Sequence, residues 1–242
     1  MMPLPQIATP TYELVLPSTG KKIKYRPFLV KEEKILILAL ESEDQKQITN
    51  AIKSTLKSCI ITRGVKVDDL PTFDIEYIFL NIRGKSVGES IDVVVTCPDD
   101  NETTVDTKIY IDEIQVKKDE NHNCDIELDG VYTLRMKYPS LNQFVQNNFS
   151  IGSNQQISVD DSFSVITSCI DMVFSQEESW SASDCTKKEL DDWLGTLDSK
   201  QFKLIETFFE TMPKLSHTVK VTNPKTNVES DVTLEGITNF FE

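Results

Sequence analysis

The chain has 242 residues, a formal net charge of −14 and 39% hydrophobic residues. This length suffices for one large core or two modest lobes, and the ordinary Gly and Pro content is typical of a globular protein and not of a disordered one. The negative charge argues against a general nucleic-acid binder, because phosphate binding requires a cationic face.

The sequence also contains no run of about 18 apolar residues, so we predict no membrane-spanning helix. The opening residues Met1–Pro5 lack the basic and apolar regions of a secretory signal, and we expect synthesis and folding in a cytosol. The five cysteines are scattered and form no CxxC pair, which predicts reduced thiols and no disulfide framework. They are Cys59, Cys97, Cys124, Cys169 and Cys185.

The first predicted element is a β-hairpin, with strands at 11–16 and 23–28 around the turn Pro17–Gly20. In its second strand the apolar Ile23 and Tyr25 alternate with basic residues. The period of two therefore places the basic side chains on one face of the strand. These side chains are Lys22, Lys24 and Arg26.

Basic residues are concentrated in this part of the chain. Residues 1–34 contain six Lys and Arg against three acidic residues, so the remainder carries all of the net negative charge. The strip of Lys22, Lys24 and Arg26 is then either a solvated face or a site that docks an acidic partner or the acidic body of the protein itself. We take these three residues as the candidate partner-binding site.

Apolar residues recur at helical spacing in five further stretches, which predict amphipathic helices. Arg83 and Gly84 are predicted to end the second of these helices, and a capping box at Thr186–Glu189 is predicted to begin the fourth. The continuous apolar run Ile35–Leu40 favours a buried helix over a buried strand. The five stretches are 48–60, 75–82, 163–174, 190–197 and 202–212.

Two segments of the chain resemble each other. Val95–Pro98 opens a stretch that runs to Ile114, and Val221–Pro224 opens another that runs to Ile237. Each combines a strand, a Pro-containing tip, a second strand and an acidic-x-Ile exit, and each follows an amphipathic helix, which predicts a helix-plus-hairpin unit used twice. We expect the hairpin tips to be available for docking.

The predicted fold class is α+β, with amphipathic helices carrying several small antiparallel hairpins, because strands come in adjacent pairs without βαβ alternation. The two repeated lobes would cover 30–114 and 158–242, joined by a middle hairpin around Asp129–Gly130 and a linker. The predicted domains are the basic hairpin 1–29, the first lobe with the middle hairpin 30–149, the linker 150–157 and the second lobe 158–242.

No combination of residues indicates catalysis. His122 and His217 are the only histidines, and neither lies in a nucleophile motif. Cys97 sits at a hairpin tip where zinc ribbons carry a CPxC pair, but Asp100 stands at the second position. The open alternative is a zinc site of Cys97, His122 and Cys124. We predict no catalytic residue, no cofactor and no metal.

The C-terminal residues Ile237, Phe240 and Phe241 stand at i, i+3 and i+4. We expect one helical turn packed on the protein's own core near Phe208 and Phe209, because burying one Phe is worth roughly 1.5–3 kcal/mol. The alternative is a partner-docking element.

Several long blocks of the sequence resemble the T4-like bacteriophage baseplate hub assembly proteins. At Gly84 and Asn223 the chain departs from the commoner Ala and Cys, which weakens a carry-over of metal binding from this family. The blocks span nearly the whole chain and are Leu16–Lys34, Glu76–Glu89, Thr96–Asp100, Met136–Ser140 and Leu234–Phe241.

The resemblance implies a non-enzymatic protein of contractile-tail baseplate hub assembly, which binds other hub proteins as an assembly factor or chaperone. A permanent structural subunit of the virion baseplate is the alternative, and a zinc-binding protein or hydrolase is a remote one. The implied partners are other phage baseplate hub proteins, without nucleic acid or a membrane span, and an oligomer is allowed. The implied location is the host bacterial cytoplasm during assembly, or the virion tail.

Overall fold

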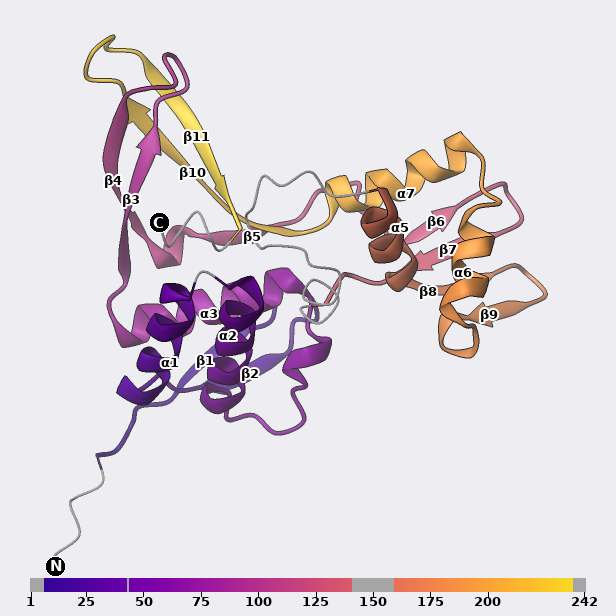
Figure 1. Ribbon diagram of the computed structural model, residues 1–242, viewed down its shortest axis with the longest axis horizontal. Coiled ribbons are helices and arrows are strands. Elements are labelled where there is room, and N and C mark those ends of the chain that lie inside the picture. The colour runs from indigo at the N-terminus through magenta and orange to yellow at the C-terminus, as the bar shows by residue number, and fades with distance from the viewer. Residues whose placement is uncertain (1–6, 43, 141–158, 237–242) are drawn as a thin grey trace, which may run out of the picture. The chain divides into compact units, whose positions relative to one another are not determined.

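The computed structural model describes residues 7–42, 44–140 and 159–236 (Figure 1). The chain divides into two compact units. Unit 1 consists of Met1–Gln115 and Leu215–Glu242, and unit 2 consists of Val116–Lys214. The described residues form α-helices and four small antiparallel sheets, which confirms the α+β class. In this described part, no helix is long and apolar enough to cross a membrane.

Unit 1 begins with the predicted hairpin, followed by three helices. In β2 the side chains of Ile23 and Tyr25 are buried, and on α2 those of Leu56 and Cys59 are buried. In α3, buried residues occur along most of the helix, from Phe73 to Gly84. These elements are β1 (Tyr12–Val15), β2 (Lys22–Tyr25), α1 (Val30–Glu41), α2 (Gln45–Cys59), the 3₁₀ turn η1 (Val67–Asp69) and α3 (Thr72–Ser86).

The two repeated hairpins both form, and both belong to unit 1 (Figure 1). Alternate residues of β3 and β10 are buried, as expected of strands with one face toward a core. β10 also pairs with β5 at the sheet's other edge. The elements are β3 (Ser90–Thr96), β4 (Thr104–Tyr110), the 3₁₀ turn η2 (Ile111–Glu113), β5 (Gln115–Lys117), β10 (Lys214–Thr222) and β11 (Glu229–Glu235).

The tips of these hairpins have the same backbone geometry. The amide of Asn101 donates to the carbonyl of Cys97 at 2.9 Å, and the amide of Asn227 donates to the carbonyl of Asn223 at 2.8 Å. Asn101 and Asn227 both have positive φ, of 56° and 58°, a conformation that Asn tolerates better than most residues. The predicted similarity of the two segments is therefore a similarity of structure as well.

Gly84 does not end α3, contrary to the prediction, since the helix continues to Ser86. The glycine is buried inside the helix, where an added Cβ would lie 2.9 Å from Ile111 Cδ1. Because glycine has no side chain, α3 can approach η2 closely at this position. Gly84 therefore has a packing role and does not act as a C-cap.

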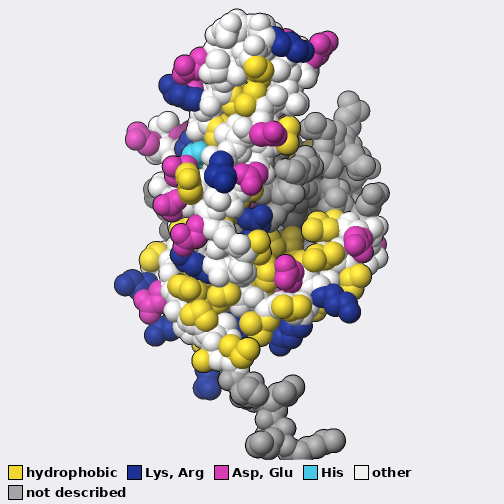
Figure 2. All heavy atoms as spheres, turned by 90° about the vertical axis from the view of Figure 1, so that its left-hand side faces the viewer, with side chains coloured by type: hydrophobic (Ala, Val, Ile, Leu, Met, Phe, Trp, Pro, Cys, Tyr) yellow, Lys and Arg dark blue, Asp and Glu magenta, His cyan; other side chains and the backbone are white. Residues whose placement is uncertain are grey.

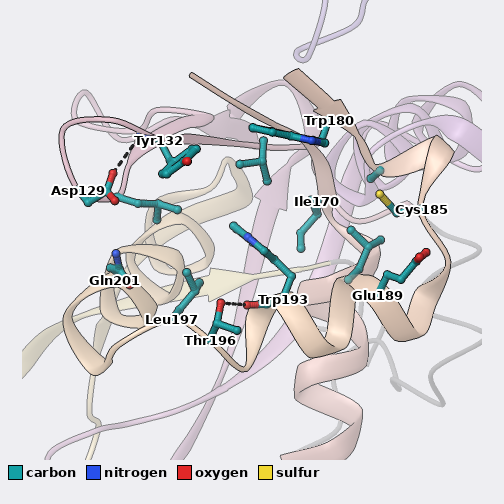
Figure 3. Close-up of a pocket in the computed structure, with 14 residues that line it drawn as sticks. Asp129, Tyr132, Ile170, Trp180, Cys185, Glu189, Trp193, Thr196, Leu197 and Gln201 are labelled. Atoms are coloured by element: carbon teal, nitrogen blue, oxygen red, sulfur yellow. Dashed lines mark hydrogen bonds between the residues drawn. The ribbon is translucent and has the colours of Figure 1, made fainter. Parts of the chain in front are cut away.

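The described residues of unit 2 form a four-stranded antiparallel sheet in the order β6-β7-β8-β9 and three α-helices. Leu134 and Met136 of β7, Ile170 of β8 and Ile205 and Phe208 of α7 share one buried hydrophobic cluster. The sheet and α6 border a pocket that is lined by both tryptophans of the chain (Figure 3). The elements are β6 (Asp125–Glu127), β7 (Thr133–Met136), α5 (Val159–Ser168), β8 (Ile170–Phe174), β9 (Ser179–Ser181), the 3₁₀ turn η3 (Ala182–Asp184), α6 (Lys187–Leu194) and α7 (Ser199–Thr211).

The stretch 163–174, predicted as one helix, is a helix followed by a strand. α5 ends at Ser168, and β8 pairs with β7 so that Leu134 lies opposite Val173. The apolar residues 170, 173 and 174 fit a helical period, but pairing with β7 satisfies the backbone of this segment within the sheet. The tertiary contact therefore overrides the local pattern.

The compact units differ from the predicted lobes. The order helix then hairpin does occur twice, as α3 before β3–β4 and α7 before β10–β11. The second hairpin, however, belongs to unit 1, while α7 belongs to unit 2. The predicted linker 150–157 and the C-terminal turn of Ile237, Phe240 and Phe241 lie outside the described residues.

Candidate functional site

Four hydrophobic side chains of α1 in unit 1 are exposed close to one another in the sequence. Ile35, Ile37, Leu38 and Leu40 expose between 45% and 57% of their surface, and on this helix only Glu32 and Ala39 are buried. The helix predicted at Ile35–Leu40 is confirmed, but its predicted burial is wrong. Consecutive apolar residues point to all sides of a helix, so a helix that packs on one side must expose the others.

An apolar groove of about 240 Å³ lies beside this helix. Its walls come from α1, α2 and α3, so the three helices leave space between them where α1 is only partly packed. Figure 2 shows hydrophobic side chains gathered in the lower half of the view, with both basic and acidic side chains among them. The groove is lined by Phe28, Glu33, Leu36, Ile37, Ala39, Leu40, Ile48, Ile52, Phe79, Arg83 and Val87.

Two of the three predicted basic residues are on the exposed face of β2. Lys22 and Lys24 are exposed, while Ile23 and Tyr25 between and after them are buried. Lys24 stands opposite Glu13 in the hairpin and forms an ion pair with it, at 3.4 Å between Nζ and Oε1. Both partners are more than half exposed, so this pair contributes little to stability.

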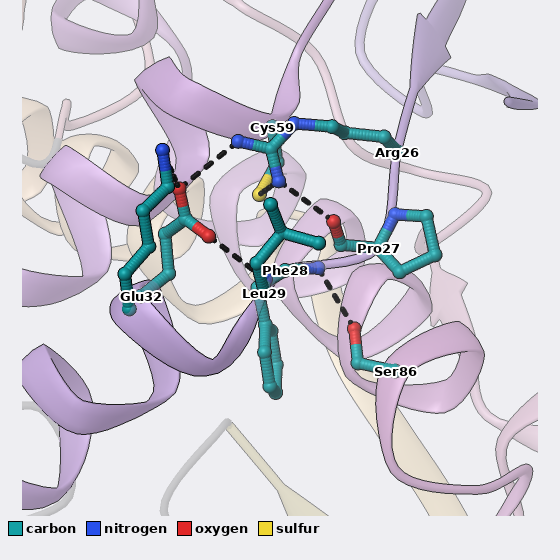
Figure 4. A network of polar contacts seen from close by, with 8 residues as sticks. Arg26, Pro27, Phe28, Leu29, Glu32, Cys59 and Ser86 are labelled. Carbon is teal, nitrogen blue, oxygen red and sulfur yellow. Dashed lines mark hydrogen bonds and ion pairs between the residues drawn. The ribbon is translucent and has the colours of Figure 1, made fainter. Parts of the chain in front are cut away.

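Arg26 has a different role, because it lies after the end of β2 and turns inward (Figure 4). Its Nη2 donates to Glu32 Oε1 at 3.0 Å, and its Nη1 donates to the carbonyl of Pro27 at 2.8 Å. The two charged side chains expose only 17% and 4% of their surface. Arg26 is therefore a structural residue of unit 1 and does not share the exposed face of Lys22 and Lys24.

Glu32 fixes the beginning of α1. Its second carboxylate oxygen accepts a hydrogen bond from the amide of Leu29 at 2.8 Å, which satisfies a backbone donor at the helix N-terminus. Burial by itself would raise the pKa of Glu32, but the hydrogen bonds from Arg26 and the Leu29 amide, with the charge of Arg26, hold it below its ordinary value. The ion pair thus holds α1 next to the end of β2, with its apolar side chains exposed.

Sequence reasoning missed this network. One signal was present, since Glu32 stands three residues after Leu29, the spacing of the second half of a capping box. The partner of Glu32 could not be read from the spacing. A further contact, from the Phe28 amide to Ser86 Oγ at 2.9 Å, joins the same connection to the end of α3.

The residues of the alternative zinc site are not brought together. Cys97 belongs to unit 1, and His122 and Cys124 belong to unit 2. Both ring nitrogens of His122 already have hydrogen-bonding partners, with Nδ1 2.9 Å from Thr211 Oγ1 and Nε2 3.0 Å from Tyr138 Oη. Over residues 7–42, 44–140 and 159–236, no three His, Cys, Asp or Glu side chains are placed to hold a metal ion.

Comparison with known proteins identifies a family. The model of a family described as "T4 bacteriophage base plate protein" matches residues 9–242. No curated protein and no solved structure shows significant similarity to the chain. The family match covers nearly the full sequence, including both repeated hairpins and α1. The chain therefore belongs to the family of T4 bacteriophage base plate proteins.

Proposed function

We propose that this baseplate protein is a non-enzymatic component of hub assembly, which binds another hub protein through α1. The observation that supports this is the set of four half-exposed hydrophobic side chains on one short helix, two of which, Ile37 and Leu40, line an apolar groove. A large exposed apolar patch on a soluble protein marks an interaction site more often than an accident of composition. We call the surface formed by Ile35, Ile37, Leu38 and Leu40 the α1 surface.

The charges around the α1 surface define the partner's chemistry. Lys31 and Lys34 are exposed on the same helix, and Lys22 and Lys24 are exposed on β2 of the same unit. Arg83 and Glu33 line the groove itself, so these basic side chains outnumber the acidic one. The matching partner is an apolar helix flanked by Asp or Glu, which would fill the groove in the manner of a helix-in-groove complex. The apolar contacts would supply most of the affinity, and the lysines would favour an acidic partner and speed association.

The test is binding of the purified chain to each of the other baseplate proteins of the same phage, one at a time, by calorimetry. Ile37→Glu with Leu40→Glu should weaken the specific complex at least tenfold, because both side chains line the groove and burying the exposed half of such a side chain is worth on the order of 1 kcal/mol. Val94→Glu is the matched control, since Val94 is 61% exposed on β3 of the same unit. Equal affinity of the double variant and the control would exclude the α1 surface.

Two roles are compatible with this binding surface, and one measurement separates them. A transient assembly factor leaves the finished particle, whereas a permanent subunit of the baseplate stays in it. Mass spectrometry of purified virions decides, because stoichiometric recovery of the chain rules out a purely transient chaperone. We favour the assembly factor, as the family resemblance of the sequence implies.

A further inference from the structure

Unit 2 contains an open pocket of about 580 Å³. Trp180 of β9 and Trp193 of α6, the only two tryptophans of the chain, lie on opposite sides of it, with Tyr132 beside them (Figure 3). Trp180 and Tyr132 are both more than 40% exposed, with their ring centroids 6.1 Å apart. Fourteen residues line the pocket: Leu128, Asp129, Tyr132, Ile170, Val173, Trp180, Ala182, Cys185, Glu189, Leu190, Trp193, Thr196, Leu197 and Gln201.

The charged groups that line this pocket are both acidic. Asp129 lies at one end and Glu189 at the other, with the two tryptophans between them (Figure 3). The backbone amides of Tyr132 and Val131 lower the pKa of Asp129, and hydrogen bonds from Thr186 lower that of Glu189. Both carboxylates therefore stay ionised at neutral pH, and no Lys, Arg or His is among the lining residues.

The pocket also adjoins the edge of a sheet. β9 is the last strand in the order β6-β7-β8-β9, and Trp180 stands opposite Val173 of β8 in the pairing. Both of these residues line the pocket. An extended peptide beside β9 can bind its backbone edge and place one side chain in the pocket, as in recognition by strand addition.

We propose that this pocket binds an extended segment of another baseplate protein, with one aliphatic or aromatic side chain between Trp180 and Trp193 and a Lys or Arg two residues before and after it, on the same face of the segment. The apolar walls accept the anchor side chain, and the carboxylates of Asp129 and Glu189 pair with the flanking cations. Arg also stacks well on exposed aromatic rings. This second docking site differs from the α1 surface in its unit, its charge and the shape of its occupant.

Because the only two tryptophans of the chain line the pocket, their fluorescence emission reports binding there. Three ten-residue peptides in a Gly/Ser background carry Arg-Leu-Arg, Glu-Leu-Glu or Arg-Gly-Arg at alternate central positions, each separated by one Ser so that the three side chains share a face. They are titrated into the full chain while tryptophan emission is followed. Arg-Leu-Arg should produce a saturable shift that weakens as salt rises, because exposed charges are screened. No saturable shift with Arg-Leu-Arg, or an equal shift with Glu-Leu-Glu, overturns the proposal.

Charge-removing variants test the role of the two carboxylates without disturbing the fold. Asp129→Asn and Glu189→Gln keep an oxygen that accepts the same backbone hydrogen bonds, from the Tyr132 amide at 2.8 Å and the Thr186 amide at 2.7 Å. Each should raise the Kd for Arg-Leu-Arg roughly two- to fivefold. The matched control is Glu177→Gln with Asp231→Asn, two exposed acids that do not line the pocket. If the variant that combines Asp129→Asn and Glu189→Gln binds Arg-Leu-Arg with unchanged affinity, the proposal is contradicted.

Failure of this proposal and failure of the proposed function give different results. Ile37→Glu with Leu40→Glu alters the groove side of the α1 surface in unit 1 and should leave the peptide-induced emission shift unchanged. Thr196→Arg, which adds a positive charge at an exposed residue of the pocket, should abolish that shift and retain binding through α1.

Discussion

Asn223 Nδ2 lies 2.9 Å and 3.0 Å from the two carboxylate oxygens of Asp99, so the tips of the two repeated hairpins are bound to each other. Thr226 donates a further hydrogen bond to the same carboxylate. The side chain of Asn223 is fully buried, although it belongs to a hairpin tip. The tips were expected to be available for docking, but the structure uses these side chains to join β3–β4 to β10–β11.

Asp99→Ala should loosen both tips together. The buried Asn223 amide loses its acceptor, and an unsatisfied buried donor is unfavourable. The backbone amides of Asn101 and Asn227 should therefore exchange with solvent roughly tenfold faster or more, measured by hydrogen exchange. The control is Asp106→Ala, an exposed residue of β4. Faster exchange in the β3–β4 tip alone would show that the hairpins do not support each other.

Arg26→Ala should destabilise unit 1 by roughly 2–3 kcal/mol, because the buried carboxylate of Glu32 loses its hydrogen-bonded cation and keeps only the exposed Lys31, whose Nζ lies 3.4 Å from Oε1. Lys24→Ala, which breaks an exposed pair, should change the free energy of unfolding by less than about 1 kcal/mol. Urea denaturation followed by circular dichroism measures both. If both variants changed the free energy of unfolding by a similarly small amount, Arg26 would be an exposed residue like Lys24 and not part of a buried ion pair.

The same ion pair sets a pH dependence. The folded-state pKa of Glu32 is lowered, so its contribution to stability is complete above the unfolded pKa of about 4.3 and is lost as pH falls through the folded value. Glu32→Gln should reduce this loss between neutral and acidic pH. The role of Arg26 also changes how the basic strip is tested. Only Lys22 and Lys24 can be changed to Glu without breaking the buried ion pair of Arg26.

Asp74→Asn should preserve or increase stability at pH 7. Asp74 is fully buried at the start of α3 and accepts hydrogen bonds from the Ser18 hydroxyl and, at 3.0 Å, from the Ser18 amide. Burial raises its pKa despite these bonds, so stability falls as pH rises from the unfolded value of about 3.9 through the folded one. The Asn variant removes that slope and keeps an acceptor.

Asp74→Ala is the matched comparison for this prediction. It removes the acceptor of the Ser18 amide and should destabilise the protein by about 1–3 kcal/mol. Thermal unfolding from pH 4 to pH 8 separates the variants. A steeper pH dependence in Asp74→Asn than in the parent chain would contradict the assigned direction of the shift.

Gly84→Val should destabilise unit 1 by about 1–3 kcal/mol through overpacking against Ile111. Gly84→Ala should be close to neutral, because a gain of about 1 kcal/mol in helix propensity opposes the displacement of Ile111 Cδ1. In an Ile111→Val background, which removes that methyl group, the same Gly84→Ala change should become stabilising. Additive effects in this double-mutant cycle would show that the two residues do not interact.

The hairpins and most helices could be predicted from the sequence because their signals are local. The turn at Pro17–Gly20, the tip residues after Cys97 and Asn223, and the capping box at Thr186 each act within a few residues. The boundary between α5 and β8 could not be predicted, since it depends on pairing with β7, more than 30 residues earlier in the chain.

The functional surfaces were harder to predict for a different reason. The apolar run of α1 gave the helix but not its exposure, because burial depends on what packs around it. The alternating basic pattern correctly placed Lys22 and Lys24 on one face of β2. The strand ends at Tyr25, however, so Arg26 does not lie on that face and instead contacts Glu32. The pocket of Trp180 and Trp193 joins a strand edge to a helix, and no local spacing connects them.

The chain enters unit 2 after Gln115 and returns to unit 1 at Leu215. A ribosome must therefore synthesise all of unit 2 before the second hairpin of unit 1 exists, a delay on the order of 5–20 s. Throughout that time Asp99 has neither Asn223 nor Thr226 to bind. During synthesis unit 1 therefore cannot complete its fold until β10 and β11 are made, whereas unit 2 is one continuous segment and can fold as soon as it has left the ribosome.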